Sequence, residues 1–559
     1  MTNLEDSSVV FTGNLDQRGV YSVRLFRSIT GLRCYLENQR FSNYSLKDVF
    51  SNSDCSRNFS VEVGFVPTMG ALHEGHLSLI RRARKENKIV VVSIFINPLQ
   101  FGPNEDLDRY PQTLEKDKEL CRAVGVDALF MPTPWQMGID SGNQQSVTTL
   151  VNPPELLTQV LCGRSRIGHF EGVATIVMKL LNIVQPCRAY FGQKDAQQVA
   201  VIRRMVRDLN IPVEIVVCPV VRESNGLALS SRNQYLTVEE YGKAAILYQG
   251  LKLAEEAFQH GEKSALMLIE IVEKELIKCS EIAVEYVELV HPLTMETLNE
   301  VTQEGLLAVA VRLGSTRLID NVLLTNRQPV VAIDGPAGAG KSTVARLVAE
   351  TLKLHYLDTG AMYRALTWFV LRSGVDLEDS AAISELISQC NIEFRSHALA
   401  NSQSTERIFV NGQDVTQAIR SLEVTSQVSN IAAQPAVRKE LVRQQQAYGQ
   451  LGGIVAEGRD IGTHVFPDAE LKIFLTASVE ERARRRQKDM QHQGLSEISL
   501  EEIERLIHER DLKDSTRAIA PLIKADDAIE VCTDGLSIED VVDKINELFR
   551  QRSEKCPSN

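Results

Sequence analysis

VVAIDGPAGAGKS, at residues 330–342, decides the fold of the second half of the chain. VVAID has the length and apolar character of a buried strand, and residues 342–351 have the composition of a helix. Between them, GPAGAGKS fits the pattern G-x-x-x-x-G-K-[ST], the P-loop whose glycines let backbone N–H groups curl around phosphates. A strand, this loop and a helix in succession predict an α/β domain that binds a nucleotide.

The residues of this loop have separate expected roles. Lys341 is expected to neutralise charge on the β- and γ-phosphates and to be a catalytic residue, and the Ser342 hydroxyl is expected to ligate Mg²⁺. The expected ATP contacts are Gly335, Gly338, Gly340, Lys341, Ser342 and Thr343. The loop indicates a nucleotide but not the group that accepts the phosphoryl.

Two apolar runs of strand length, at residues 61–66 and 89–96, lie far upstream of the P-loop. A helix-like segment at 75–85 separates them, and strand, helix, strand at this spacing predicts a βαβ unit and a parallel sheet. The second run, IVVVSIFI, is almost wholly apolar, as in strands that helices cover on both faces. The first half of the chain is therefore expected to contain a second α/β domain.

The pattern changes after Ser231. A helical stretch at 244–258 precedes strand-like runs at 284–290 and 306–313, which predicts a smaller α+β subdomain. The polar segment 324–328 leads to Pro329 and marks the boundary between the two halves. The expected organisation is an extension at 1–22, a domain at 23–210, its subdomain at 211–326 and a last domain at 327–559, with a polar insertion at 38–58.

Composition limits the classes of function. The chain has 559 residues and a net charge of −12, which argues against a nucleic-acid partner. No apolar run has the length of a membrane span, and residues 1–19 do not resemble a signal peptide, so we expect no membrane partner and a cytoplasmic location. The ten cysteines form no C-x-x-C pair and no zinc-spaced cluster, which is typical of core residues in a reducing compartment.

PTMGALHEGH, at residues 67–76, follows the first predicted strand and opens the helix after it. A helix N-terminus presents free N–H groups and the positive end of the helix dipole to an anion. His73 and His76 share one helix face there, and two imidazoles can stabilise charge that develops on phosphoryl oxygens. Taken alone, the pair also fits ordinary surface histidines or a metal site, although no third ligand stands at a telling spacing.

Three later segments carry side chains suited to a nucleotide and an acid. NPLQF at 97–101 follows the second strand at its carboxyl end, where open parallel sheets bind ligands. FGQKD at 191–195 and LSSRN at 229–233 add a lysine, an arginine and two serines that suit a triphosphate. The amides of Gln100 and Gln198 suit a neutral polyol or carboxylate substrate.

PTMGALHEGH, NPLQF, GHFEGV, FGQKD and LALSSRN occur in the order found in pantothenate synthetases, and residues 23–322 resemble that family closely. The resemblance implies a Rossmann-like fold of the nucleotidylyltransferase superfamily, with its H-x-G-H signature at His73 and His76. It also implies a reaction in two steps. Pantoate attacks the α-phosphate of ATP to give pantoyl adenylate and pyrophosphate, and β-alanine then attacks the acyl carbon and releases AMP.

The same resemblance implies roles for particular residues. His76 matches the family's catalytic proton donor, and the implied ATP contacts are Met69, His73, His76, Gly192, Gln193, Lys194, Asp195, Val221, Leu229, Ser230, Ser231 and Arg232. Gln100, Gln198 and Arg166 are implied to contact pantoate or β-alanine, with Arg166 on the phosphate side. Cys162, Ile167 and Gln193 replace residues expected to be Glu, Pro and Glu; none is an implied catalytic group, but they bear on loop geometry near Arg166.

The sequence after the P-loop resembles cytidylate kinases over nearly its whole length. LDTGAMYR at 357–364, AEGRDIG at 456–462, and ERD at 509–511 through APL at 520–522 match pieces of that family's monophosphate site. The resemblance implies a P-loop NMP-kinase fold and a CMP site shaped by Thr359, Arg364, Arg438, Arg459, Asp460, Arg510, Asp514 and Arg517. Arginines bind phosphate in bidentate fashion, and carboxylates can accept from an exocyclic amine or a sugar hydroxyl.

The arginine run RARRR at 482–486 has two interpretations. It fits a solvated helix face, and it also fits a lid that closes over ATP and shields the transfer from water. The resemblance to cytidylate kinases favours the lid, without assigning single residues.

We therefore expect a bifunctional α/β enzyme: a Rossmann-like nucleotidylyltransferase domain with a small α+β subdomain, followed by a P-loop NMP-kinase domain. Its expected ligands are ATP, Mg²⁺, pantoate, β-alanine and CMP or dCMP, and a homodimer through the ligase half is expected. One alternative makes the second half a nucleotide sensor without turnover; the intact Lys341 and the arginine set argue against it. The other alternative is a nucleotidylyltransferase that acts on a different acid.

Overall fold

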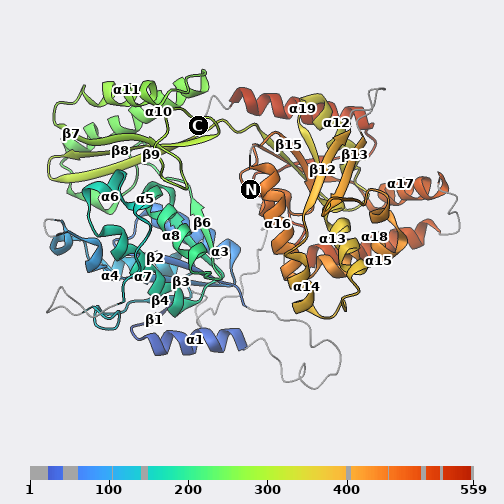
Figure 1. Cartoon of the computed structure of the whole chain (residues 1–559), viewed down its shortest axis with the longest axis horizontal. Coiled ribbons are helices and arrows are strands. Elements are labelled where there is room, and N and C mark those ends of the chain that lie inside the picture. The colour runs from blue at the N-terminus through green and yellow to red at the C-terminus, as the bar shows by residue number, and fades with distance from the viewer. Residues whose placement is uncertain are drawn as a thin grey trace, which may run out of the picture. The chain divides into compact units, whose positions relative to one another are not determined.

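The computed structural model describes residues 23–41, 61–102, 105–139, 149–397, 405–450, 452–492, 499–516 and 520–555. The expected extension at 1–22 lies outside these residues, as does the expected insertion from residue 42 onward. Internal contacts separate two compact units, Met1–Thr325 and Asn326–Asn559 (Figure 1). Each unit has its own parallel sheet and its own hydrophobic core.

The first unit is built on six parallel strands, which confirms the α/β fold expected from the sequence. The strand order is β1-β4-β3-β2-β5-β6. The strands are β1 (Arg24–Phe26), β2 (Val63–Thr68), β3 (Ile89–Ile94), β4 (Ala128–Phe130), β5 (Arg188–Gly192) and β6 (Glu214–Cys218). The sheet therefore extends beyond residue 210, at which the sequence analysis ended this domain, because β6 pairs in parallel with β5.

The continuous apolar run of β3 is explained by burial on both faces. Ile89 and Val91 belong to one core, and Val90 and Val92 belong to the other. Successive side chains of a strand point to opposite faces, so a strand between two helical layers is apolar at every position. One layer consists of α1 (Ile29–Phe41), α7 (His169–Val184) and α8 (Ala196–Asp208), and the other consists of α3 (Glu74–Glu86) and α4 (Leu114–Ala123).

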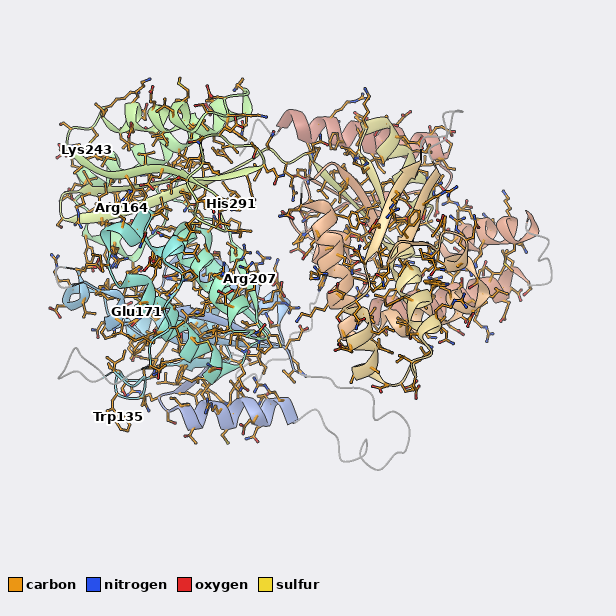
Figure 2. The ribbon with its side chains drawn as sticks, viewed as in Figure 1. Trp135, Arg164, Glu171, Arg207, Lys243 and His291 are labelled. Atoms are coloured by element: carbon orange, nitrogen blue, oxygen red, sulfur yellow. The ribbon has the colours of Figure 1, made fainter. Side chains whose placement is uncertain are left out.

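A second, three-stranded antiparallel sheet completes the first unit. It consists of β7 (Ile282–Val290), β8 (Glu304–Leu313) and β9 (Thr316–Thr325), with α10 (Ile246–Gln259) and α11 (Ala265–Leu276) on one face. The other face joins the core of the parallel sheet through Tyr286, Leu306 and Ala310. The short helix α6 (Leu161–Ser165) also contacts this sheet, since Arg164, labelled in Figure 2, forms an ion pair with Glu288 of β7.

The second unit contains five parallel strands in the order β11-β15-β10-β16-β17. They are β10 (Val330–Asp334), β11 (His355–Asp358), β15 (Ile454–Gly458), β16 (Leu471–Thr476) and β17 (Ile529–Cys532). Val331 and Ile333 of β10 pack against α12 (Lys341–Leu352) and α19 (Ile538–Lys555). Val330 and Ala332 face the opposite core, which contains α13 (Thr359–Ser373) and α16 (Pro435–Gly449).

Smaller elements surround this sheet. A second antiparallel sheet is formed by β12 (Ile392–His397), β13 (Thr405–Val410) and β14 (Gln413–Asp414). The remaining long helices are α15 (Leu422–Ala432), α17 (Val479–His492) and α18 (Leu500–Thr516). Among the described residues, no helix combines the length and the apolar character needed to cross a bilayer.

Candidate active sites

Three loops of the first unit start at the carboxyl ends of neighbouring strands. β2 lies between β3 and β5 in the sheet. Met69 follows β2, the 3-10 turn with Gln100 (Pro98–Gln100) follows β3, and Gln193–Asp195 follows β5. Strand order reverses at this point, and such switch points are where open parallel sheets bind ligands.

His73 and His76 stand at the start of α3, as expected. His73 caps the helix by accepting from the Gly75 N–H through Nδ1 (3.2 Å), and the His73 N–H donates to Nδ1 of His76 (3.4 Å). Since Nδ1 is the acceptor in both rings, the proton of each neutral imidazole is on Nε2. The ring centroids lie 4.1 Å apart.

Both histidines are held in the neutral form at pH 7. Burial, followed by the charge of Lys194, lowers the pKa of His73 to about 4. Burial, then His73 and Lys194, lower the pKa of His76 to about 3. The pair therefore offers two Nε2–H hydrogen-bond donors beside the Lys194 ammonium.

The loop before α3 is fixed by a buried carboxylate. Gly70 (φ +87°) and Ala71 (φ +51°) both adopt left-handed backbone conformations, which is unusual for alanine. Asp117 accepts from the N–H groups of Ala71 (3.0 Å) and Leu72 (2.8 Å), and Ser231 Oγ donates to the Ala71 carbonyl (3.1 Å). Ser231 is thereby placed against the start of α3.

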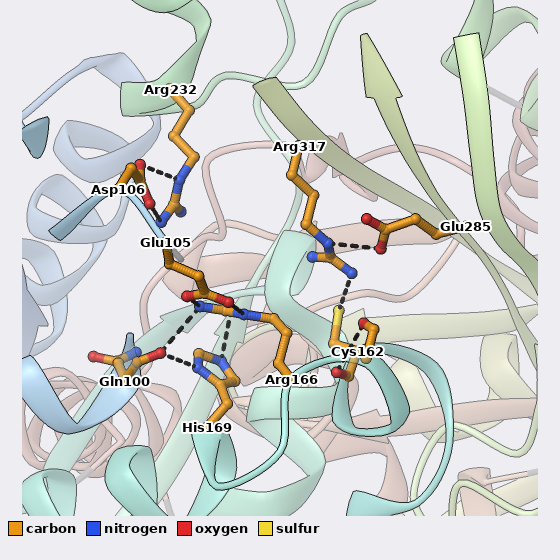
Figure 3. Close-up of polar contacts among 10 residues, drawn as sticks. Gln100, Glu105, Asp106, Cys162, Arg166, His169, Arg232, Glu285 and Arg317 are labelled. Atoms are coloured by element: carbon orange, nitrogen blue, oxygen red, sulfur yellow. Dashed lines mark hydrogen bonds and ion pairs between the residues drawn. The ribbon is translucent and has the colours of Figure 1, made fainter. Parts of the chain in front are cut away.

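Arg166 reaches Gln100 through a network that Figure 3 shows. Its guanidinium pairs with both oxygens of Glu105 (2.7 and 2.5 Å) and donates to the Gln100 carbonyl (3.0 Å). His169 donates from Nδ1 to the same carbonyl (2.8 Å), so its Nε2 accepts from Arg166 (3.0 Å). In this arrangement Arg166 and His169 orient the Gln100 segment.

Arg232 is held by a second carboxylate. Its Nε and Nη2 both lie 2.8 Å from Asp106, in a bidentate pair (Figure 3). Ser230 caps the 3-10 turn Ser231–Tyr235 by accepting from the Arg232 N–H. Leu229 lies over the start of α3, where a Cβ on Gly75 would stand 3.6 Å from the Leu229 Cβ.

The other expected ligase residues lie along the same edge. Lys194 and Asp195 stand in the turn after Gly192, close enough to affect the pKa of His73. Gln198 is half-buried in the first turn of α8, and Met69 and Val221 are half-buried in loops. Of these residues, Asp195 alone is exposed.

The three departures from the ligase pattern have distinct surroundings. Cys162 is buried, with its Sγ 3.1 Å from the Tyr286 hydroxyl. The same Sγ lies 3.5 Å from Nη2 of Arg317 (Figure 3). Ile167 is 94% exposed, so a replacement there leaves the core unchanged. The backbone carbonyl of Gln193 accepts from Asn321 (3.1 Å).

The P-loop of the second unit has the geometry that its glycines permit. Gly335 (φ +149°), Gly338 (φ +80°) and Gly340 (φ +86°) all have positive φ, and a Cβ on Gly335 would lie 2.1 Å from the Leu475 carbonyl oxygen. Lys341 is buried and donates to the Pro336 carbonyl (2.8 Å), and burial lowers its pKa well below the ordinary value. Ser342 and Thr343 are exposed at the start of α12.

Two buried carboxylates border the P-loop. Asp334 accepts from the N–H groups of Ile461 (2.8 Å) and Gly462 (2.7 Å), and burial raises its pKa to about 6. Glu457 accepts from Tyr356 (2.6 Å) and from Ser342, and burial raises its pKa as well. No cluster of three metal-ligating side chains occurs among the described residues.

Five of the expected CMP residues form ion pairs. Arg438 pairs with Asp460 (2.5 Å), Arg459 with Asp514 (3.0 Å) and Arg364 with Asp358 (3.2 Å). Thr359 donates to the Glu457 carbonyl (2.6 Å). Arg510 lies near Arg459, and burial, followed by that charge, lowers its pKa; Arg517 lies outside the described residues.

The arginine run divides into inward and outward members. Arg482 is 3% exposed and donates to the P-loop carbonyl of Ala337 (3.2 Å) and to Asp511 (2.6 Å). Arg485 contacts Thr533, whereas Arg484 and Arg486 are exposed. Helix α17 is therefore attached to the P-loop through Arg482 and presents solvated charges on its other side.

Sequence reasoning assigned no role to several residues that shape these sites. They are Asp117, His169, Asp320, Asn321 and Asp334. His169 lies within GHFEGV, a segment of the ligase pattern, so the sequence held a signal for it. The others are ordinary polar residues in sequence, and only burial against distant loops distinguishes them.

Comparison with known proteins identifies a family for each half of the chain. The family model for pantoate-beta-alanine ligase matches residues 43–323, and the model for cytidylate kinase matches residues 331–551. Proteins of Trichormus variabilis and of a Nostoc species, both named bifunctional pantoate ligase/cytidylate kinase, are 60% identical over 532 residues. Each alignment covers 95% of this chain and 99% of the relative.

A solved structure also matches the first half. The pantothenate synthetase of Thermus thermophilus is 43% identical, with a TM-score of 0.48, and the match covers 54% of this chain and 99% of that one. The matches to both family models and to full-length relatives named as enzymes do not favour a non-catalytic sensor. The chain belongs to the bifunctional pantoate ligase/cytidylate kinase family.

Proposed function

We propose that the first unit condenses pantoate with β-alanine at the expense of ATP, and that the second transfers the γ-phosphoryl of ATP to CMP or dCMP. The observation that carries the first activity is the pair of neutral histidines beside Lys194 at the start of α3. The P-loop with its adjacent ion-paired arginines carries the second.

In the ligase, the pantoate carboxylate oxygen attacks the α-phosphorus and pyrophosphate leaves. Negative charge develops on the phosphoryl oxygens, where the Nε2–H groups of His73 and His76 and the Lys194 ammonium stabilise it. Preorganised donors in a partly buried site act most strongly where charge appears. The amine of β-alanine then attacks the acyl carbon, and AMP leaves.

We infer the substrate positions from the loops that surround the site. Ser230, Ser231 and Arg232 would contact the triphosphate. The triphosphate would then compete with Asp106 for the Arg232 guanidinium. Gln100 and Gln198 follow strands on either side of β2 and would hold pantoate between them, with Arg166 orienting Gln100. Met69, Val221 and Leu229 would line the adenosine side.

In the kinase, a CMP phosphate oxygen attacks the γ-phosphorus and ADP leaves. The P-loop amides and Lys341 bind the ATP phosphates once Lys341 leaves the Pro336 carbonyl. Mg²⁺ fits the hydroxyl of Ser342 with the Glu457 carboxylate behind it, because oxygen donors are its preferred ligands. When bound, it would neutralise charge on the ATP phosphates.

The state of the cysteines supports a cytoplasmic location. All eight cysteines that the structure describes are free, which fits a reducing compartment. A homodimer through the ligase half stays a prediction, and sedimentation equilibrium of the chain tests it.

The experiment supplies the purified chain with pantoate, β-alanine, CMP, ATP and Mg²⁺ and identifies every product. Pantothenate with AMP and pyrophosphate, together with CDP and ADP, is expected. AMP without pantothenate would indicate a different acid or amine substrate. ATP binding without CDP formation would support a sensor.

A further inference from the structure

Two adjacent residues of β9 contact both nucleotide loops of the ligase site. Asp320 and Asn321 are 3% and 5% exposed, although both are polar. Burying polar groups is unfavourable unless they form hydrogen bonds, so their partners indicate why they are there. Those partners lie in the turn after β5 and in the loop after β6.

Asn321 fixes the turn that carries Lys194. Its Nδ2 donates to the backbone carbonyls of Gln193 (3.1 Å) and Lys194 (2.9 Å), which are 128 and 127 residues away in sequence. One amide group thus satisfies two consecutive carbonyls and sets the direction in which the Lys194 side chain leaves the turn. Lys194 in turn lies close enough to lower the pKa of both His73 and His76.

Asp320 fixes the loop between Val221 and Leu229. Its carboxylate forms a buried bidentate pair with Arg222 (2.5 and 3.1 Å). Arg222 also donates to the Gly226 carbonyl (3.2 Å), and the Leu229 N–H donates to Val221 (2.9 Å) across the same loop. The ends of this loop therefore keep a fixed position relative to β9.

β9 belongs to a sheet that packs against the core of the parallel sheet, and its Ile319 is packed against that core. β9 is an edge strand of the antiparallel sheet. One face of that sheet packs into the core of the large domain through Tyr286 of β7 and through Leu306 and Ala310 of β8. The antiparallel sheet is thus the frame against which Asp320 and Asn321 hold the two loops. A small pocket between frame and loops is lined by Lys194, Ser230, Asn233, Arg317 and Asp320.

We propose that Asp320 and Asn321 are positioning residues for ATP in the ligase reaction, through which the small subdomain sets the geometry of Lys194 and of the Val221–Leu229 loop. This inference rests on the proposed ligase activity. Neither side chain needs to touch substrate, because each acts through backbone or through Arg222.

The test measures ligase kinetics of the full chain with Asn321→Leu. Leucine has the same number of side-chain heavy atoms and the same branch at Cγ but no donor, so Lys194 loses its fixed direction. We expect the ligase kcat/KM for ATP to fall about tenfold, the size expected for losing a buried hydrogen-bonding group. The KM for β-alanine should change less than about twofold, since the amine enters only after adenylation. CMP phosphorylation by the same sample measures the amount of intact protein.

Asn87→Leu is the matched control. Asn87 is 6% exposed and donates through Nδ2 to two acceptors, the Ala83 carbonyl and the Tyr190 hydroxyl, at the far end of α3. The loss of the Asn87 amide should lower the melting temperature but leave the ligase KM for ATP unchanged.

Asp320→Asn is a further test variant. It keeps the shape of the side chain and loses the charge that holds Arg222. We expect it to lower the ligase kcat/KM for ATP, as Asn321→Leu does.

The outcomes separate the inference from the activity on which it rests. If Asn321→Leu lowers only the melting temperature, as Asn87→Leu does, the residue is structural and the inference is overturned. If Asn321→Leu does not fold, Asn321→Ser is the second variant, and an unchanged kcat/KM for ATP there also overturns it. A wild-type chain that makes no pantothenate overturns the proposed ligase, and this inference with it.

Discussion

At the scale of single residues, the ligase site is defined by which ring nitrogen of each histidine carries the proton. His73 and His76 accept backbone N–H groups at Nδ1, and burial keeps both rings neutral. Neutral imidazoles donate hydrogen bonds without adding a cation, so the positive charge of the site comes from Lys194 and Arg232. In the kinase site Arg438 and Arg459 are paired to carboxylates, as Arg232 is in the ligase site.

Removing one donor should separate the two activities. We expect His76→Ala to lower pantoate adenylation by about 10²-fold or more, the usual effect of losing a transition-state donor, and to leave CMP phosphorylation unchanged. Lys341→Ala is the mirror variant and should abolish CDP formation while the ligase keeps its rate. Both rates are measured on each variant. A His76→Ala chain with near-normal ligase turnover would contradict the assignment.

The depressed histidine pKa values can be measured directly. His73 and His76 should titrate with midpoints near 4 and 3 rather than 6.5. Because the unfolded chain binds these protons below pH 6.5 and the folded chain does not until about pH 4, the free energy of unfolding should fall as pH drops through that window. Nitrogen-15 NMR, with His73→Gln and His76→Gln for assignment, gives the midpoints. Values above 6 would contradict the inferred neutral pair.

Acceptor choice in the kinase is also a matter of single groups. Cytosine presents an amine donor where uracil presents a carbonyl. A carboxylate acceptor in the pocket, for which Asp460 and Asp514 are the expected candidates, would pair only with the first. We expect CMP and dCMP to be used about 10- to 100-fold better than UMP, and AMP to be poor because its base is larger. The comparison is kcat/KM for the four acceptors at equal ATP. Preference for AMP would indicate an adenylate kinase, and equal use of UMP a general pyrimidine kinase.

At the scale of elements, the sites depend on how closely backbones approach. Helix α7 lies against the Gln100 turn at Gly172, whose Cβ would stand 2.2 Å from the Leu99 carbonyl oxygen. Asn97 donates to the Gly172 carbonyl at the same place (3.0 Å). The position of Gln100 is therefore set by a glycine on a helix that carries no proposed substrate contact at that point.

A methyl group at this contact should displace the turn. We expect Gly172→Ala to lower the free energy of unfolding of the first unit by about 1–3 kcal/mol, the usual effect of overpacking, and to raise the ligase KM for pantoate. Chemical denaturation and steady-state kinetics measure the two effects. Gly242→Ala is the control, since no atom lies within 4 Å of its Cβ and alanine favours a helix. Equal behaviour of the two variants would show that α7 does not set the Gln100 position.

At the scale of the whole molecule, the chain consists of two units with separate machinery. β9 ends at Thr325, and Arg327 pairs with Asp468 and Glu470 of the second unit. The segments that carry the ligase residues and those that carry the kinase residues do not interleave in sequence. The two reactions share ATP but no intermediate.

Cutting the chain between Thr325 and Asn326 should leave two active pieces. Arg327 stays with its partners, and β9 keeps its pairing with β8, so neither core is opened. Each piece is expressed alone and assayed for pantothenate or CDP formation, with kinetic constants expected within about twofold of the intact chain. Loss of one activity from a folded piece would show that the units depend on each other.

Local sequence was enough to predict the P-loop, the histidine pair and the strands β2, β3 and β10. Their signals lie within ten or so residues, because a period-2 or unbroken apolar pattern and a glycine at positive φ are decided by neighbours in the chain. The family resemblance added the reaction and the expected ligand of each loop in sequence order. The resemblance did not specify which side chains contact one another.

Tertiary structure alone decided which groups meet. Arg166 with Glu105, Arg232 with Asp106 and Asn321 with Lys194 are joined across 61, 126 and 127 residues. A carboxylate or amide shows no sign in sequence of which distant partner will satisfy it, because that depends on how strands and helices pack. The sequence determined two nucleotide-binding α/β domains and their order. Only packing determined that the small antiparallel sheet β7-β8-β9 contacts the loops of the first domain.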